Sequence, residues 1–160
     1  MAAEAFTADN KTDFSVQIQK AKDAGAELVF LPIYYQEASL ILAQANKAGF
    51  TPKWFGCDGM DGILDLDGFD ASLAEDLMFL TPFTANATDE ATQKFVADYK
   101  EAFGDTPIQF AADAYDGVYA IKAAAEKAEI TPDMSTSDIC DALKTAMTEI
   151  QIDGLTGTEM

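Results

Sequence analysis

Residues 28–62, LVFLPIYYQEASLILAQANKAGFTPKWFGCDGMDG, contain the pattern that decides the fold of this chain. The apolar run 28–31 predicts a short strand, and the next apolar residues recur at helical spacing until Gly49, which is placed to end a helix. A second short run, 53–56, predicts another strand and leads into Cys-Asp-Gly at 57–59. Strands that alternate with helices in this way predict an α/β fold built on a parallel sheet.

Two side chains with binding chemistry follow the predicted strands. Tyr34 comes just after the first strand and Asp58 just after the second. Because ligands of parallel α/β sheets bind outside the carboxyl ends of the strands, we expect both residues at one edge of the sheet. An aromatic ring and a carboxylate there suit a small ligand that carries a cation and an apolar body. Alternation predicts that Tyr34 and Tyr35 point to opposite sides, so at most one of them faces the ligand.

The segment IYYQEASLILAQANKAGF at 33–50, followed by FGCDG at 55–59, resembles the second lobe of extracytoplasmic solute-binding proteins that serve branched-chain amino acid ABC transporters. The resemblance implies that the ring of Tyr34, rather than that of Tyr35, packs on the bound amino acid. It also implies that Asp58 receives the ammonium group of the ligand. Asp58 lies 24 residues after Tyr34, which is the separation that the family shows.

The resemblance extends over essentially the whole chain but covers only the C-terminal portion of the family's length. It implies a partial type I periplasmic-binding-protein fold, with a Rossmann-like parallel sheet flanked by helices and parts of both lobes. Residues 1–81 would belong to the second lobe and contain the ligand-site loops, whereas residues 82–160, mainly helical in pattern, would return to the first lobe. A hinge is expected near Thr81–Phe83, where the pattern changes.

A third ligand contact is implied by PIQFAADAYDGVYAIKAAAEKA at 107–128, which resembles the first-lobe helix after this crossing. Its early aromatic residue, Phe110, lines the pocket in family members. Tyr115 and Asp116 are interpreted instead as a packing contact and a structural hydrogen bond. The candidate ligand-binding residues are therefore Tyr34, Asp58 and Phe110.

Each candidate also has a purely structural interpretation. Tyr34 could cover the core at a strand end, because aromatic rings mostly serve packing. Asp58 could hydrogen-bond its own backbone in an Asp-Gly turn. Phe110 also fits the apolar stripe of its predicted helix, so the sequence favours neither interpretation for this ring.

The composition excludes several classes of protein. The chain has 28 acidic and 10 basic residues and a formal net charge of −18, so its surface repels nucleic acid and anionic membranes. It has no histidine, which removes the commonest general base and every Ser-His or Cys-His nucleophile. We therefore expect no catalytic residue and no enzyme. Cys57 and Cys140 are too few for a disulfide framework and are predicted to be free thiols, with a bridge between them as the alternative.

No metal or other cofactor is expected. Residues 57–70 have the acids and glycines of a calcium loop, but placing Gly68 at the invariant glycine of an EF-hand puts Ile63 first and Ala74 twelfth among the ligand positions. Neither side chain binds calcium, so the stretch is predicted to be a loop and a short helix.

The resemblance implies the substrate-binding component of an ABC importer for branched-chain or related apolar amino acids, present as a C-terminal fragment. Its expected partners are the small-molecule ligand and a membrane permease. Its expected location is the periplasm or a lipid-anchored position at the cell surface, although this chain carries no signal sequence. The earlier βα units of the family, which supply donors for the ligand's carboxylate, are absent, so exposed edges could also pair two copies into a homodimer.

Two alternative functions stay open. An amino-acid-sensing receptor ectodomain has the same fold, and no residue here separates it from a transport component. A free-standing flavodoxin-like domain would carry phosphate-binding glycines or an acid cluster after its first strand, whereas the loop after Leu31 is PIYYQE.

Local signals also predict helix starts and further strands. The predicted N-caps are Thr12, Thr88, Thr106 and Ser135, and residues 106–109 have the spacing of a capping box. A strand is predicted at 76–80, and partial strands at 3–6 and 154–157.

Overall fold

The computed structural model describes residues 3–160, which divide into two compact units. The first unit ends at Thr81 and the second covers Pro82–Met160. Each unit has a hydrophobic core of its own. The assignment of the units to two lobes stays a prediction.

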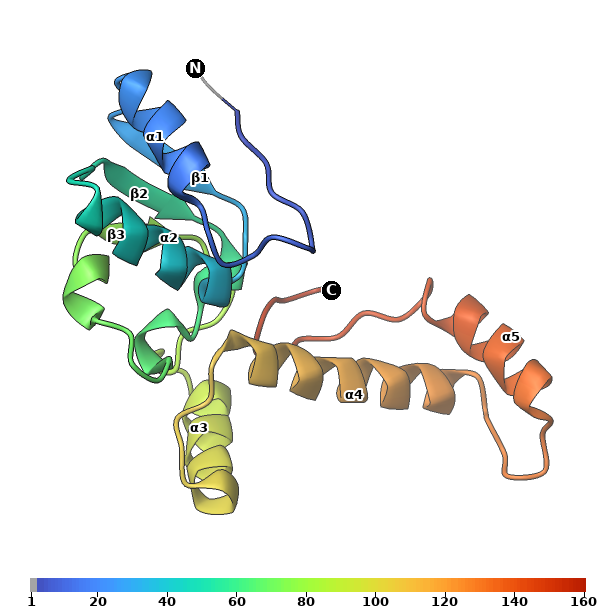
Figure 1. Ribbon diagram of the computed structural model, residues 1–160. Helices are drawn as coiled ribbons and strands as arrows, with labels where there is room; N and C mark the ends of the chain where they lie inside the picture. The colour runs from blue at the N-terminus through green and yellow to red at the C-terminus, as the bar shows by residue number, and fades with distance from the viewer. Residues whose placement is uncertain (1–2) are drawn as a thin grey trace. The chain divides into compact units, whose positions relative to one another are not determined.

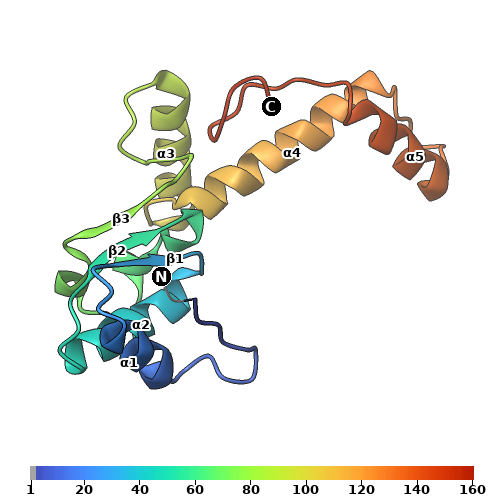
Figure 2. The same ribbon diagram turned by 90° about the horizontal axis from the view of Figure 1, so that it is seen from above.

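The first unit is built on three parallel strands in the order β1-β2-β3, with two helices along one face (Figures 1 and 2). This confirms the α/β class that the alternating pattern predicts. Three short 3-10 turns lie between β2 and β3. The bounds are α1 Ser15–Asp23, β1 Leu28–Leu31, α2 Tyr35–Lys47, β2 Lys53–Gly56 and β3 Leu77–Phe79, with the turns η1 Asp58–Met60, η2 Ile63–Asp65 and η3 Ala71–Ala74.

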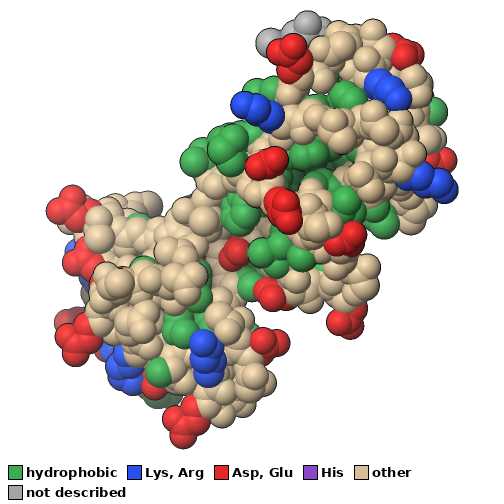
Figure 3. Space-filling model, turned by 90° about the vertical axis from the view of Figure 1, so that its left-hand side faces the viewer, with side chains coloured by type: hydrophobic (Ala, Val, Ile, Leu, Met, Phe, Trp, Pro, Cys, Tyr) green, Lys and Arg blue, Asp and Glu red, His purple; other side chains and the backbone are tan. Residues whose placement is uncertain are grey.

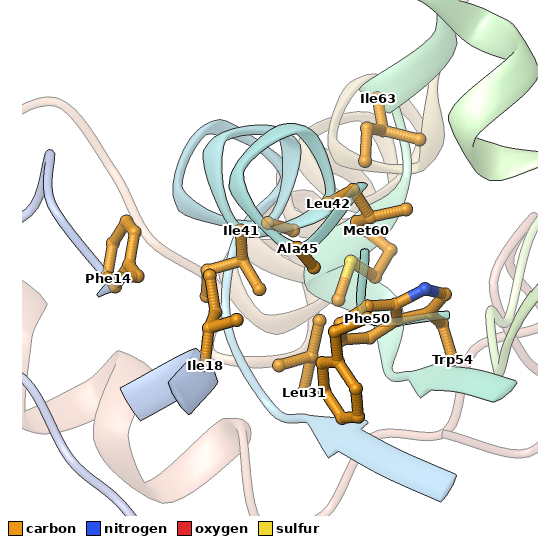
Figure 4. Close-up of a cluster of buried hydrophobic side chains, with 11 residues drawn as sticks. Phe14, Ile18, Leu31, Ile41, Leu42, Ala45, Phe50, Trp54, Met60 and Ile63 are labelled. Atoms are coloured by element: carbon orange, nitrogen blue, oxygen red, sulfur yellow. The ribbon is translucent and has the colours of Figure 1, made fainter. Parts of the chain in front are cut away.

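The core of this unit lies between the sheet and the two helices. Leu31 and Trp54 are buried on the helix-facing side of β1 and β2, where Figure 4 shows Leu31 near Ile18 of α1 and Trp54 beside Phe50. The rings of Trp54 and Phe50 meet edge to face, with centroids 6.2 Å apart. Burying these apolar side chains is the main force that fixes the two helices on the sheet.

The other face of the sheet carries a row of apolar side chains. Phe30, Phe55 and Met78 occupy facing positions on the three strands, and the rings of Phe30 and Phe55 lie 6.0 Å apart. Phe30 is 56% exposed and Met78 is 54% exposed. Within the described residues, this face is therefore open to solvent.

The second unit is helical and contains α3 Glu90–Phe103, α4 Gln109–Lys127 and α5 Thr136–Ala146. Its core joins Phe83 and Phe95, whose rings meet edge to face at 5.9 Å, with Val96 and Ala112. Among residues 3–160, no helix has the length and apolar content needed to cross a membrane.

The predicted start of α1 at Thr12 is wrong, and a contact distant in sequence explains the difference. The helix begins after Phe14, whose backbone N–H donates to the Gln44 side chain at 2.8 Å. The amide of Gln44 in turn donates to the Thr12 carbonyl oxygen at 2.9 Å. The Ser15 N–H donates to the Asp13 carboxylate at 3.0 Å, so Gln44 on α2 and Asp13, rather than the Thr12 hydroxyl, satisfy two orphan donors at this helix end.

The start of α3 differs by one residue from the prediction. Asp89 rather than Thr88 is the N-cap, and its carboxylate accepts from the Thr92 backbone N–H at 2.8 Å. A carboxylate also interacts favourably with the positive end of the helix dipole, which a threonine hydroxyl does not. The hydrogen bonds from Thr92 lower the pKa of Asp89.

The capping box predicted at Thr106 does not form. Residue Ile108 is the N-cap of α4, so the helix starts two residues later than the pattern predicts. The buried Gln109 side chain donates to Asp113 at 3.2 Å. At α5 the prediction is confirmed, because the Ser135 hydroxyl accepts from the Asp138 backbone N–H at 3.2 Å.

Both partial strands are also wrong. Residues 3–6 form no strand, and the Ala5 carbonyl oxygen accepts from the Gln17 side chain at 3.0 Å. Residues 154–157 lie in a turn, closed by a hydrogen bond of 2.8 Å from the Gly154 N–H to the Gly157 carbonyl oxygen. In the C-terminal segment the Asp116 carboxylate on α4 also accepts from the N–H groups of Leu155 and Thr156, so these backbone groups are satisfied without a neighbouring strand.

Acidic side chains are scattered over the face shown in Figure 3 rather than gathered in one patch. This distribution agrees with the interpretation of the net charge of −18 as a solvated surface.

Candidate functional site

The ends of β1 and β2 place Tyr34 and Asp58 around one pocket. Leu31 and Gly56 are register partners, so the two parallel strands end side by side and their loops leave the same edge of the sheet. The pocket has a volume of about 290 Å³. It is lined by Phe6, Pro32, Ile33, Tyr34, Glu37, Cys57, Asp58 and Gly59.

The two neighbouring tyrosines separate as the alternation predicts. Tyr34 is the N-cap of α2, has an extended backbone and is 60% exposed, with its ring at the pocket. Tyr35 is partly buried and packs against the core of the first unit. Tyr34 is therefore placed where a ligand can reach it, whereas Tyr35 serves the core.

Asp58 presents a carboxylate that the protein itself does not use. The turn that follows is closed by main-chain oxygens, because Met60 N–H donates to the Cys57 carbonyl at 3.0 Å and Asp61 N–H to the Asp58 carbonyl at 3.1 Å. The Asp58 side chain is exposed and has no hydrogen bond or ion pair to residues 3–160. The structure does not contain the bond from Asp58 to its own backbone that the structural interpretation requires.

The two loops touch through their backbones at Gly59. A Cβ atom added to Gly59 would lie 2.6 Å from the Ile33 carbonyl oxygen and 3.3 Å from the Tyr34 Cα atom. The next residue, Met60, is fully buried in the core, as Figure 4 shows. The close contact at Gly59 and the buried side chain of Met60 together hold Asp58 beside Tyr34. The sequence pair Asp-Gly predicts a turn here but does not predict this contact between the loops.

A second carboxylate at the pocket escaped the sequence analysis. Glu37 lies in the first turn of α2 and lines the same pocket as Asp58. It is paired with Lys11 at 3.2 Å, and its side chain is only 14% exposed. The sequence could have indicated Glu37, because it lies three residues after Tyr34 at a helix start and residues at this spacing share a helix face.

Phe110 lies in the second unit, as the second residue of α4, and is half-buried. Its role in ligand binding stays a prediction.

Asp116 has the structural role that the sequence predicted. The side chain is buried and accepts from the backbone N–H groups of Leu155 at 2.9 Å and Thr156 at 2.8 Å. The Thr156 hydroxyl donates to the same carboxylate at 2.7 Å. These bonds fix the C-terminal turn against α4.

The second unit contains a larger pocket, of about 470 Å³, whose ionic groups already have partners. Of the residues that line it, Lys122 pairs with Glu126 at 3.3 Å and Lys94 pairs with Asp98 at 2.6 Å. A hydrogen bond with Tyr119, together with partial burial, raises the pKa of Tyr115 here to about 12. This pocket is less suited to a charged ligand than the one at the strand ends.

The predicted thiols are confirmed as free. Cys57 is half-buried at the pocket and Cys140 is exposed on α5. In the part of the chain that the structure describes, no three Cys, Asp or Glu side chains form a metal-binding group.

Comparison with known proteins gives concordant results from sequence and structure. Residues 1–160 match the sequence pattern of the family described as periplasmic binding protein. The chain is 31% identical over 103 residues to a Leu/Ile/Val-binding protein homolog of Brucella abortus, covering 61% of this chain and 26% of that protein. It is 29% identical over 125 residues to a leucine-, isoleucine-, valine-, threonine-, and alanine-binding protein of Pseudomonas aeruginosa, covering 78% and 33%.

Two solved structures are similar at the level of the fold. A leucine binding protein from Thermotoga maritima aligns with a TM-score of 0.73 and 27% identity, over 96% of this chain and 42% of that chain. A branched-chain amino acid transporter substrate binding protein from Streptococcus pneumoniae, solved in complex with isoleucine, gives the same four values. The chain therefore spans about a quarter to a third of these curated relatives and less than half of these structures.

Proposed function

The chain belongs to the periplasmic binding protein family, and from this premise we propose that it supplies one side of a binding site for leucine, isoleucine, valine or a related small apolar amino acid. The observation that carries the proposal is the pairing of Tyr34 with the unpartnered carboxylate of Asp58 in one pocket at the ends of neighbouring parallel strands. The names of the relatives from Brucella abortus and Pseudomonas aeruginosa support the choice of ligand.

The chemistry of the pocket matches the ammonium end of an amino acid. Leaving water with an unpaired charge is costly, so a buried ammonium group needs an anion beside it. Asp58 provides that anion, and the face of the Tyr34 ring attracts the same cation. The rings and apolar groups of Phe6 and Ile33 line the same pocket and suit an apolar body.

The rest of the site is proposed to lie in a full-length protein of the size of its relatives. Donors for the ligand's carboxylate would come from sequence outside residues 1–160, because this chain spans 42% of the structures with which it aligns. Phe110 would supply a third ligand contact, and the lobes would close by a hinge near Thr81–Phe83.

The proposed setting is outside the cytoplasm, with the membrane permease of an ABC importer as partner. A receptor ectodomain that senses amino acids is the alternative. Neighbouring permease and ATPase genes support transport, whereas a signalling domain in the same reading frame supports the receptor. Pairing with a second copy is also proposed, through the open face of the sheet.

The test of the ligand is calorimetry of the full-length protein against a panel of amino acids, sugars and dicarboxylates. We expect heat of binding from leucine, isoleucine or valine, since the site offers one anion and apolar walls. Binding of sugars or dicarboxylates alone would overturn the proposal.

A further inference from the structure

Two carboxylates line the pocket at the strand ends, but only one of them is unpaired. Glu37 is matched by Lys11 at 3.2 Å, whereas Asp58 has no partner among residues 3–160. Lys11 does not line the pocket itself. It changes the charge of the pocket from outside, by neutralising one of its two acids.

The segment that carries Lys11 is held in place by contacts other than the ion pair. The side chain of Gln44 binds both the Phe14 N–H and the Thr12 carbonyl oxygen, at 2.8 and 2.9 Å. Further along, the ring of Phe6 meets Phe14 edge to face at 5.1 Å and lines the pocket. These anchors position the Lys11 backbone independently of its charge, so the charge can be removed without releasing the segment.

We infer that Lys11 is a specificity-determining residue, which keeps the pocket at a single unpaired carboxylate and so restricts it to ligands with one cationic group. The part of this inference that concerns ligands rests on the proposed function. A monoamino acid satisfies Asp58 and leaves no other acid in the pocket in need of a cation. A ligand with a second ammonium group, such as lysine or ornithine, meets no second anion and pays desolvation without compensation.

Loss of Lys11 should turn the pocket into a site for dications. Glu37 lies in the first turn of α2, where the helix dipole favours its negative charge even without the lysine. The pocket would then be lined by two unpaired acids, Glu37 in the first turn of α2 and Asp58 after β2. A unit charge several ångströms away in a hydrated site changes the local concentration of a singly charged probe by roughly threefold.

Cys57 allows this charge to be measured in the chain itself, because its thiol lines the same pocket. The experiment uses a Cys140→Ser background, which removes the exposed thiol on α5. Two methanethiosulfonate reagents are compared, one with a trimethylammonium group and one with a sulfonate group. The ratio of their reaction rates with Cys57 reports the electrostatic potential at the pocket.

Lys11→Met should raise the cation-to-anion rate ratio by roughly tenfold, because the two reagents respond to the new charge in opposite directions. Adding Glu37→Gln to Lys11→Met should return the ratio to the starting value. Lys20→Met is the matched control, since Lys20 has a similar exposure and pairs with Glu4 at 2.9 Å, and neither residue lines the pocket. Salt should reduce the difference between variants.

An unchanged ratio in Lys11→Met, or an equal change in Lys20→Met, would overturn the inference. Failure of Glu37→Gln to reverse the effect would do the same, since it would show that the lysine acts without Glu37. Circular dichroism of each variant identifies unfolding. The comparison of Lys11→Met with the double variant separates the charge of Glu37 from any structural effect of losing Lys11.

The ligand arm uses calorimetry of the full-length protein with leucine and lysine. Lys11→Met should shift the preference toward lysine by at least roughly tenfold, and the double variant should restore the original preference. If the unmodified protein binds no apolar amino acid, the proposed function fails, while the reagent ratio still decides the role of Lys11. If leucine binds but the preference does not shift, only the inference about Lys11 fails.

Discussion

Three acidic residues in this chain show how partners, rather than residue type, define a role. Asp116 accepts three hydrogen bonds from the C-terminal turn, Glu37 pairs with Lys11, and Asp58 has no partner within residues 3–160. The partners of Asp116 lie 39 and 40 residues away in sequence, so local patterns do not reveal them. The residue free to receive a ligand is recognised only after the others have been assigned.

The role of Asp58 can be tested by removing its charge. We expect Asp58→Asn in the full-length protein to weaken amino acid binding by about 3 to 5 kcal/mol, because breaking a buried charge pair leaves the ammonium group unmatched. Calorimetry with leucine provides the measurement.

The matched control is Asp67→Asn, on the same acidic stretch but exposed and outside the pocket. It should change the affinity by less than about 0.5 kcal/mol. Equal and small effects of the two substitutions would show that Asp58 is only a loop residue.

At the scale of secondary structure, the sequence predicts elements better than it predicts their beginnings. Apolar spacing predicts α2, and β2 is found at 53–56 as predicted. The helix ends at Gly49 and Gly104 are marked by glycines with positive φ, a conformation that other residues adopt at a cost. The start of α1 depends partly on Gln44, which lies 30 residues from Phe14, and a local pattern could show only the contribution of Asp13.

Gly59 provides a test of how the two site loops are held together. We expect Gly59→Ala to destabilise the first unit by about 1 to 3 kcal/mol, since the new Cβ would meet the Ile33 carbonyl oxygen, a backbone atom that cannot rotate away. It should also weaken leucine binding in the full-length protein, because Asp58 would move from Tyr34. Denaturant unfolding and calorimetry measure the two effects.

Gly117→Ala in α4 is the control for the same chemical change. A Cβ there meets no atom within 4 Å, and replacing a helical glycine by alanine stabilises a helix by about 0.5 to 1 kcal/mol. If Gly59→Ala is as stable as this control, the close contact between the two site loops does not contribute to stability and the prediction is wrong.

At the scale of the whole molecule, the resemblance predicts the family and the fold, and the match over residues 1–160 confirms both. The placing of Tyr34 and Asp58 at one edge follows from strand order, which the sequence predicts. The uncovered row of Phe30, Phe55 and Met78 does not follow from local patterns, because burial depends on which segments pack on the sheet. The local sequence likewise does not predict whether Phe110 is buried or exposed, because this depends on which segments pack around it.

The open face of the sheet predicts self-association of the 160-residue chain. Phe30 and Met78 are both more than half exposed, and apolar patches of this kind favour contact with a second copy. Light scattering should show a mass that rises with concentration, and Phe30→Lys should return it to that of a monomer. Leu64→Lys, at an exposed leucine outside the strands, is the control and should leave association unchanged. A monomer at all concentrations would contradict the prediction.

The two site loops meet through main-chain atoms, at Gly59 and at Ile33–Tyr34. These main-chain atoms form the frame of the pocket, whereas the side chains that line it contact the ligand. The side chain at position 34 can be exchanged without removing the main-chain atoms that make this contact. Evolution or engineering can therefore vary the ring that meets the ligand while the acid stays where it is. A protein arranged in this way can acquire a new ligand by successive single substitutions, each made on an intact frame.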